Sequence, residues 1–547
     1  MTVRLDTAYR SAAVRALTGT EFDVLVVGGG VVGAGAALDA ASRGLSVALV
    51  EARDWAAGTS SRSSKLVHGG LRYLEQRDFG LVREALRERR LLLHRLAPHL
   101  VRPVPFLYPL THRGWERAYV GAGVALYDSI GGAHALPMHR HLSRTRALGL
   151  APSLRPDALT GAVRYHDAQV DDARLTMMIA RTAAQHGATV ITRAEARDLL
   201  RDGGRVVGAR VHDGYSGATH AVRARRVISA TGVWTGGLGS PASAKPFTIT
   251  MSKGVHVLVP RSRIRLDLGL ITRTEKSVLF VIPWGRFWLL GTTDTPWEGD
   301  PDRPTATRAD VDYVLAHANA LLREPLRMQD VVGVYAGLRP LIAGGAAETT
   351  KLSREHAVAE PEPGHAVVAG GKLTTYRVMA ADVVDVAARG LGAAVAPSLT
   401  NRLPILGAVG YHELLADRFA LAARTGLPVS TVERLLGRYG SAVSELLSLV
   451  EDDPALAEPL GDGYLAAEAV YAVTHEGALD LADVLTRRTR IAIEYPDGGV
   501  AVAARTAALI GDHLGWSADD RQAAVTAYRE QIRAETAALS PASLAPA

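Results

Sequence analysis

The chain has 547 residues, of which 48% are hydrophobic and 22% charged, values typical of a globular protein large enough for two or three domains. Its 62 basic and 56 acidic residues give a formal charge of +6, a mild excess that suits anionic substrates or anionic lipid. The absence of cysteine excludes disulfides, thiolate catalysis, iron–sulfur ligation and cysteinyl attachment of a cofactor, and the lack of a dense basic tract argues against a nucleic-acid partner.

Residues 1–20 carry arginines among alanines and lack the continuous apolar core of a signal peptide. No segment reaches the roughly 20 uninterrupted apolar residues that a membrane-spanning helix needs. We therefore expect a cytoplasmic protein, or one attached to the inner face of the cell membrane without crossing it.

The first predicted elements form a βαβ unit over residues 22–51. The apolar run Phe22–Val27 predicts a buried parallel strand, and a helix and a second strand, Ser46–Val50, follow it. The acid after the second strand can accept hydrogen bonds from ribose hydroxyls. A glycine turn taken alone is also compatible with close packing or flexibility, but here every element of the dinucleotide-binding fingerprint occurs in order. The residues that carry it are Gly28, Gly30, Gly33 and Glu51.

A loop rich in serine and glycine follows at Gly58–Tyr73. One interpretation is a flexible surface connection. The sharper one is a loop that wraps the phosphates of a cofactor and places His68, Arg72 and Tyr73 beside its reactive end. After this loop, the leucines and arginines of residues 79–96 predict an amphipathic helix.

The stretch Trp115–Ile130 predicts a second helix, apolar and preceded by basic and aromatic residues. It could lie at a membrane interface. Burial against a neighbouring domain is the alternative, and the sequence leaves both open.

Short β-runs then alternate with Asp-Gly turns, at Thr189–Arg193, Arg205–Asp213 and Arg226–Ser229. The last run ends in Ala230-Thr231-Gly232, a small-residue turn that would allow a second close approach to a cofactor. Longer strands follow at Phe247–Pro260 and Leu270–Thr293, with a hairpin predicted around Gly285-Arg286. This pattern predicts an antiparallel sheet in a second domain, closed by a helix near residues 308–323.

The segment Val367–Tyr376 again predicts a strand, a glycine turn and a helix N-terminus. Such a terminus offers free N–H groups and a positive dipole end to an anion. From Leu406 onward the Ala-, Leu- and Arg-rich composition predicts a separate helical domain. Two roles are open for this helical domain: it could cap the second domain, which would bind the substrate, or it could form a homodimer.

Several motifs now agree on one family. The most specific is SSKLVHGGLRYL at residues 63–74, supported by DDARL at 171–175, GLRPL at 337–341, GGKLTTY at 370–376 and DVLTRRTR at 483–490. Together they resemble FAD-dependent glycerol-3-phosphate dehydrogenase, a respiratory enzyme of the D-amino-acid-oxidase superfamily, and the likeness runs from about residue 20 to the end.

The resemblance implies an α/β chain (α+β overall) in three parts: a Rossmann-like FAD-binding domain of glutathione-reductase type, an antiparallel-sheet substrate domain and a C-terminal all-helical domain. We expect the FAD-binding domain at 21–100, 161–244 and 335–398. The substrate domain is expected at 101–160 and 245–334, and the helical domain at 399–547.

The resemblance also implies roles for individual residues. For the cofactor, FAD, these are Gly28, Gly30, Gly33, Glu51, Ser60, Ser61, Ser63, Ser64, Lys65, Leu66, Thr231, Gly232, Gly371, Lys372, Leu373 and Thr374. For the substrate end they are His68, Arg72, Tyr73, His256, Arg339, Arg354 and Lys372. No metal is expected. The FAD is expected to be non-covalent, although the sequence does not exclude a histidyl link.

The expected reaction is hydride transfer from C2 of sn-glycerol 3-phosphate to N5 of FAD, which yields dihydroxyacetone phosphate. A base must take the C2 hydroxyl proton, and His68 is preferred over His256. A phosphomonoester carries up to two negative charges, and the planar guanidinium group of arginine can donate to its oxygens in a bidentate manner. For any single arginine of this chain, a surface salt bridge is the simpler interpretation.

For the electron acceptor, the family implies membrane quinone, which fits a mildly basic protein at an anionic membrane surface. An oxidase that passes electrons to oxygen and makes hydrogen peroxide is the alternative. A flavin-dependent protein that modifies nucleic acid is a weaker alternative, because such proteins can share the first fingerprint.

Overall fold

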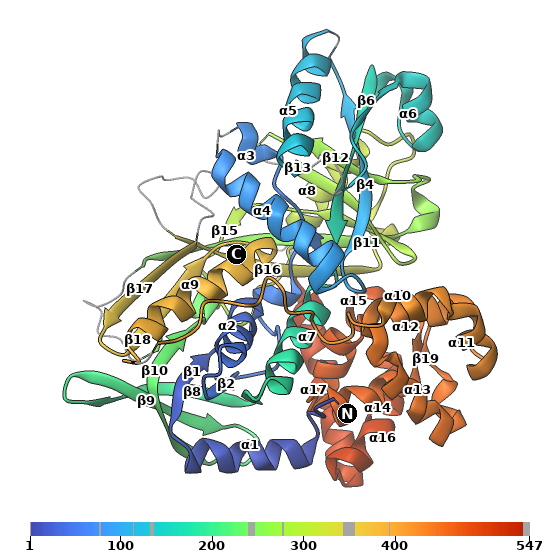
Figure 1. The fold of residues 1–547 in the computed structure, drawn as a ribbon. Coiled ribbons are helices and arrows are strands. Elements are labelled where there is room, and N and C mark those ends of the chain that lie inside the picture. The colour runs from blue at the N-terminus through green and yellow to red at the C-terminus, as the bar shows by residue number, and fades with distance from the viewer. Residues whose placement is uncertain are drawn as a thin grey trace, which may run out of the picture.

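The computed structural model describes residues 2–75, 78–112, 114–131, 136–238, 247–275, 278–342, 356–392 and 394–539, except for the side chains of Arg72 and Glu75. Within these residues the chain forms two large β-sheets covered by helices, and a region of packed helices towards the C-terminal end (Figure 1). The expected mixed α/β class is confirmed. The domain limits given above stay a proposal.

The first sheet has a parallel centre built from strands far apart in the sequence. They are β17 (His356–Glu362), β18 (His365–Gly370), β10 (Thr219–Ser229), β1 (Phe22–Val27), β2 (Val47–Val50) and β7 (Thr189–Ile191), in spatial order. All run parallel except β17. The carboxyl ends of the parallel strands therefore meet at one edge, where α/β sheets bind their ligands.

Helices cover both faces of this sheet. On one face lie α2 (Val31–Ser42), α7 (Asp172–Gln185) and α9 (Tyr376–Arg389), and on the other lies α1 (Thr7–Gly19). Successive residues of β1 point to opposite faces, so Val24 and Val26 join the first core and Leu25 and Val27 the second. The predicted burial of this strand on both faces is confirmed.

One strand of this region was not predicted. The structure has a hairpin of β8 (Ala194–Asp202) and β9 (Arg205–Asp213), and β9 also pairs with the outer end of β10. The β8 sequence AEARDLLRD lacks the β-branched residues that mark strands, so only its pairing with β9 makes it one.

The second sheet is mainly antiparallel, as expected. Its strands are β3 (Leu66–Val67), β4 (Arg102–Leu110), β5 (Arg140–Ser143), β6 (Gly161–Gln169), β11 (Ile249–Pro260), β12 (Gly269–Arg273), β13 (Val278–Trp284), β14 (Phe287–Gly291), β15 (Thr295–Pro296) and β16 (Gly333–Ile342). The predicted hairpin is confirmed as β13 and β14, joined at Gly285-Arg286.

Helices also cover both faces of the second sheet. One face packs against α8 (Arg308–Asn319) and α6 (Arg144–Leu150), and the other against α5 (Trp115–Gly131). The helix predicted from residue 79 is α4 (Phe79–Leu91), which packs beside α5. A one-turn helix α3 (Arg72–Glu75) precedes it.

The C-terminal region is almost entirely helical, as expected. Its helices are α10 (Tyr411–Ala416), α11 (Arg418–Thr425), α12 (Val429–Tyr439), α13 (Val443–Asp452), α14 (Ala466–His475), α15 (Ile491–Glu494), α16 (Val500–Leu514) and α17 (Ala518–Thr536). A two-stranded hairpin of β19 (Pro459–Gly461) and β20 (Tyr464–Leu465) departs from the all-helical expectation. Among the helices of the described ranges, none is long and apolar enough to cross a membrane.

Candidate active site

A cavity of about 930 Å³ lies at the carboxyl edge of the first sheet and continues to the second sheet. It is lined by the turn after β1, the end of β2, the loop over residues 57–68, the turn after β10 and the turn between β18 and α9. Most of the predicted site residues contribute to its wall. These are Gly28, Gly30, Glu51, Ser60, Ser63, Ser64, Leu66, His68, Thr231, Gly232, His256, Arg339, Gly371, Lys372, Leu373 and Thr374.

The glycine turn after β1 is packed too tightly for side chains. Gly28 has φ of +110°, and a Cβ there would lie 2.6 Å from the Ala230 carbonyl oxygen. A Cβ on Gly33 would lie 1.8 Å from the Gly28 oxygen, so this glycine allows the helix to pack on the strand although it does not line the cavity. Gly30 is the N-cap of α2 and has no side chain to cap the helix, so the N-terminus of α2 lies at the cavity wall, where the Ser60 hydroxyl accepts from Val31 N.

Glu51 stands at the end of β2 beside this turn. One carboxylate oxygen accepts a hydrogen bond from Gly29 N at 2.6 Å and the other from Arg53 N at 2.8 Å. The carboxylate is thus held at the cavity wall by backbone donors, and each oxygen keeps a further lone pair for a ligand hydroxyl.

The serine-rich loop is tied to the elements around it rather than free. The Ser60 hydroxyl accepts from Val31 N at 2.9 Å, Ser63 donates to Asp172 Oδ2 at 2.7 Å, and Thr59 donates to the Leu338 carbonyl at 2.6 Å. The interpretation of this segment as a flexible surface connection is therefore wrong.

Lys65 and Ser61 do not line the cavity, contrary to expectation. The Lys65 backbone is left-handed, with φ of +59°, and its ammonium group points into the protein, where it donates to Asp172 Oδ1 at 2.7 Å and to the Ser61 carbonyl at 2.5 Å. Burial, and then the nearby Arg490 charge, lower the pKa of Lys65 to about 8. This lysine serves an internal ion cluster because Asp172 is its nearest counter-ion.

Arg339 reaches the far end of the cavity from β16. Its guanidinium donates to Thr292 Oγ1 at 3.0 Å, to the Thr293 carbonyl at 3.2 Å and to Ser252 Oγ at 3.3 Å, and lies 3.5 Å from Asp294. The side chain is 22% exposed. These contacts fix the planar group in one orientation at the cavity wall.

His256 lies on the same wall, in β11. Its Nε2 is 2.8 Å from Ser64 Oγ, and its ring stacks on Tyr335 with 4.9 Å between centroids. Burial, with the charges of Arg339 and Lys65, holds the pKa of His256 well below its usual value. The ring is therefore neutral at neutral pH.

His68 and Lys372 both line the cavity, near the turn between β18 and α9. The Thr374 hydroxyl bridges the His68 N–H at 3.1 Å and its carbonyl at 3.2 Å. The Lys372 ammonium lies 3.6 Å from the centroid of the Tyr73 ring, so the buried Tyr73 supports the lysine and does not itself line the cavity. Arg354 and the side chain of Arg72 lie outside the described residues.

Four aromatic or cationic residues of the cavity wall were not predicted, namely Trp234, Arg53, Arg62 and Arg197. Trp234 follows the turn at Gly232, and the Arg53 guanidinium lies 4.6 Å from the centre of its ring. For Trp234 the sequence offered one signal, its position two residues after Gly232, which was expected to approach the cofactor. Arg53, two residues after Glu51, carries no comparable signal.

Two family models cover nearly the whole chain. One, described as FAD dependent oxidoreductase, matches residues 23–385, and the other, described as the C-terminal domain of alpha-glycerophosphate oxidase, matches residues 398–521.

Similar proteins are known over almost the full length. Glycerol-3-phosphate dehydrogenase 2 of Mycobacterium tuberculosis is 54% identical, over 97% of this chain and 91% of its own. Glycerol-3-phosphate dehydrogenase of Mycobacterium leprae is 53% identical, over 96% and 90%. The crystal structure of the Bacillus halodurans glycerol-3-phosphate dehydrogenase complexed with FAD aligns with a TM-score of 0.79 and 28% identity, covering 99% of this chain and all of that one.

Proposed function

The chain belongs to the FAD-dependent glycerol-3-phosphate dehydrogenases, and from that premise we propose that it oxidises sn-glycerol 3-phosphate to dihydroxyacetone phosphate at this cavity. The observation that carries the proposal is the make-up of the cavity wall. A dinucleotide cradle lies at one part of it, and Arg339, Lys372 and two histidines lie at another.

The residues present fit FAD. The turn at Gly28–Gly33 has no room for a Cβ at three positions, Gly28, Gly29 and Gly33, and the N-terminus of α2 lies at the cavity wall. The volume of about 930 Å³ lies at the upper end of the range for ligand pockets, as a dinucleotide needs. Glu51 would hold the ribose hydroxyls, and the turn at Gly370–Thr374 would meet the flavin. When bound, FAD supplies the hydride acceptor through N5 and carries the electrons onward.

Arg339 and Lys372 would bind the substrate phosphate. The guanidinium offers parallel N–H donors to phosphate oxygens, and the ammonium adds a point charge. Asp294 and the threonine oxygens already hold Arg339 in place, so little side-chain entropy is lost on binding. Neutral glycerol would gain none of this charge-assisted binding.

His68 is the better candidate for the base that takes the C2 hydroxyl proton. A base works best when its pKa is close to the working pH. The strongly lowered pKa of His256 makes it a weak proton acceptor, so it suits a neutral hydrogen-bonding role beside Ser64. His68 is half-buried and lines the cavity wall, where hydrogen bonds to Thr374 hold its backbone.

The main test is anaerobic mixing of the holoenzyme with glycerol 3-phosphate. We expect loss of the yellow colour of the oxidised flavin with this substrate and not with glycerol, and no change with dihydroxyacetone phosphate. Bleaching that is equal with glycerol would contradict the assignment. For the acceptor we propose membrane quinone. Rapid reoxidation by a quinone analogue with little peroxide supports it, and stoichiometric peroxide formation in air would assign the oxidase reaction instead.

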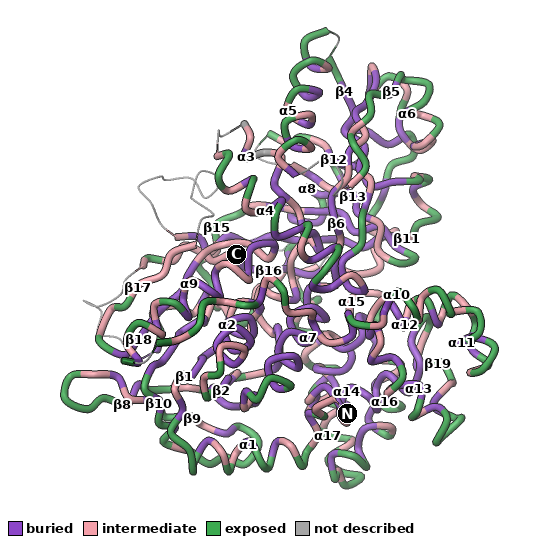
Figure 2. The backbone as a smooth tube through the Cα atoms, viewed as in Figure 1, coloured by how far each residue is buried: buried purple, intermediate pink, exposed green. Residues whose placement is uncertain are grey.

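We further propose that the protein docks on an anionic membrane surface through α5. The buried side of this helix, with Val120, Val124 and Tyr127, packs on the second sheet. The opposite side exposes Trp115, Ala118, Tyr119, Ala122, Leu126 and Ser129, and none of these is charged. Figure 1 places α5 at the end of the molecule farthest from the C-terminal helices, and Figure 2 shows its outer side exposed.

The neighbouring strand β5 adds basic character beside this helix. The His141 ring of β5 lies against Gly121 of α5, and the adjacent Arg140 of β5 is exposed. An apolar, aromatic strip with a basic neighbour suits the interface of an anionic bilayer. Flotation with vesicles tests this: Trp115→Ser/Leu126→Ser should lose binding to phosphatidylglycerol vesicles, whereas Phe419→Ser, at an equally exposed aromatic of α11, should keep it. Equal binding of both variants would refute α5 as the docking surface.

A further inference from the structure

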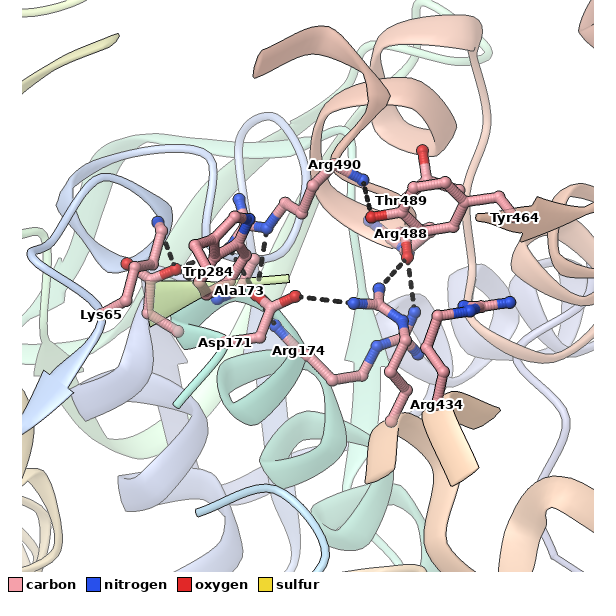
Figure 3. Close-up of polar contacts among 12 residues, drawn as sticks. Lys65, Asp171, Ala173, Arg174, Trp284, Arg434, Tyr464, Arg488, Thr489 and Arg490 are labelled. Atoms are coloured by element: carbon pink, nitrogen blue, oxygen red, sulfur yellow. Dashed lines mark hydrogen bonds and ion pairs between the residues drawn. The ribbon is translucent and has the colours of Figure 1, made fainter. Parts of the chain in front are cut away.

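The C-terminal region contacts the serine-rich loop over residues 57–68, here called the cofactor loop, at two places. Arg62 of the loop lies 3.7 Å from Glu535 of α17 near the surface, and the buried Arg490 makes the deeper contact. Arg490 follows a short helix over Asp483–Arg488 and is only 2% exposed. Its guanidinium donates to Asp172 Oδ1 at 2.6 Å, contacts Asp171, and reaches the Ser61 carbonyl at 3.4 Å. Figure 3 shows the Arg490 side chain extending from the C-terminal region towards Asp171 at the start of α7, with Lys65 close by.

Asp172 connects Arg490 to the loop through further hydrogen bonds. Its Oδ1 also accepts from Lys65 Nζ at 2.7 Å, and its Oδ2 accepts from both the N–H and the hydroxyl of Ser63, at 2.9 and 2.7 Å. Three of the residues 61–65 are therefore fixed by the pair Arg490–Asp172. Ser63 and Ser64 line the cavity, and Ser64 holds His256, so the loop connects this pair directly to the site.

The loop needs such support. Lys65 is a non-glycine residue with φ of +59°, a conformation that costs free energy and persists only where surrounding contacts enforce it. Burial raises the pKa of Asp171, but the Arg490 and Arg438 guanidinium groups outweigh that effect and hold it below its usual value. Without Arg490, the buried Asp172 and the partly buried Asp171 would share fewer cations, and the loop would shift or take up water to relieve them.

We propose that Arg490 is a positioning residue for the reaction, through which the C-terminal domain holds the loop at residues 61–65 in the conformation that binds FAD. The inference rests on the proposed function only for the identity of the substrate. It assigns the C-terminal domain a part in cofactor binding.

The chain offers a matched control for a loss of stability. Arg434 forms a bidentate pair with the buried Glu468, at 2.9 and 2.6 Å, within the C-terminal helices. Like Arg490–Asp172, this pair joins an arginine of the C-terminal region to a fully buried acid. Within the described part of the chain, neither Arg434 nor Glu468 forms a hydrogen bond or ion pair with the loop at residues 61–65. Arg434→Gln should therefore lower stability without changing FAD binding.

The experiment compares Arg490→Gln, Arg490→Lys and Arg434→Gln as holoenzymes. Release of fluorescent FAD on dilution and the thermal midpoint Tm are measured without substrate, and turnover is measured separately. We expect Arg490→Gln to release FAD about tenfold faster and to lose turnover roughly 10- to 100-fold, since small misplacements of an active site cost this much. Arg434→Gln should lower Tm and leave FAD release and turnover unchanged.

Arg490→Lys keeps the charge but not the Ser61 contact, so its FAD release should fall between those of the wild type and Arg490→Gln. It also serves if Arg490→Gln does not fold. FAD release that is unchanged in the Arg490 variants, or that follows Tm equally in all three variants, would overturn the proposal. Because FAD release needs no substrate, failure here is distinct from failure of the glycerol 3-phosphate assignment, which only the bleaching experiment would reveal.

Discussion

Replacement of Arg339 by alanine tests the phosphate-binding proposal most directly. The guanidinium is held by Thr292, Thr293 and Ser252 at 3.0 to 3.3 Å, so in the wild type its donors are already oriented. Hydrogen bonds to charged groups contribute about 1.5–3 kcal/mol each. Loss of one such contact should lower kcat/KM for glycerol 3-phosphate about 10- to 150-fold, chiefly through KM.

The assay is steady-state turnover with a soluble electron acceptor, with glycerol 3-phosphate and glycerol measured side by side. The discrimination between them should shrink by the same factor, because glycerol never used the contact. Arg308→Ala is the control, since Arg308 forms an exposed pair with Asp312 on α8 and should leave both substrates unaffected. An unchanged ratio of kcat/KM between the two substrates in Arg339→Ala would refute the phosphate-binding role.

Three further predictions address the cradle, the base and pH. Gly33→Ala should abolish FAD retention, because its Cβ would lie 1.8 Å from the Gly28 oxygen, whereas Gly149→Ala meets no atom within 4 Å and should retain FAD on gel filtration. His68→Gln should lower kcat about 10²- to 10⁴-fold with little change in KM, and His256→Gln should lower it less; the reverse order in steady-state kinetics would exchange their roles. Burial lowers the pKa of His99 to about 3, below its unfolded value of 6.5, so its contribution to stability is lost as pH falls below 6.5. The free energy of unfolding should therefore fall by about 2 kcal/mol between pH 7 and pH 5 because of this group. In urea unfolding at the two pH values, His99→Gln should show a smaller fall than the wild type, and an identical fall would refute the lowered pKa.

The placement of the glycine turns and of the acid at the cavity wall was predictable because the signals for it are local. The β-branched run of β1, the glycine spacing and the acid after β2 each constrain backbone conformation or burial within a few residues. The same holds for the turn between β18 and α9. Such patterns act before any long-range contact forms, so they can be recognised in the chain itself.

Other features depended on contacts between distant segments. The β8 strand exists because β9 pairs with it, although its own residues do not favour a strand. Lys65 was expected at the cofactor, yet its ammonium turns inward, because Asp172 lies 107 positions along the chain and 2.7 Å away in space. The direction of a long charged side chain is decided by the counter-ion that folding brings to it.

By itself the sequence determined the dinucleotide cradle, the order of the sheet and helical regions, and the motifs that identify the family. The tertiary structure decided which cations face the cavity, that Arg339 does and Lys65 does not, and that Arg490 connects the C-terminal helices to the cofactor loop. The physical reason is one of range. Backbone propensities and apolar periodicity act between near neighbours, whereas ion pairing and burial of charge depend on residues that only the fold brings together.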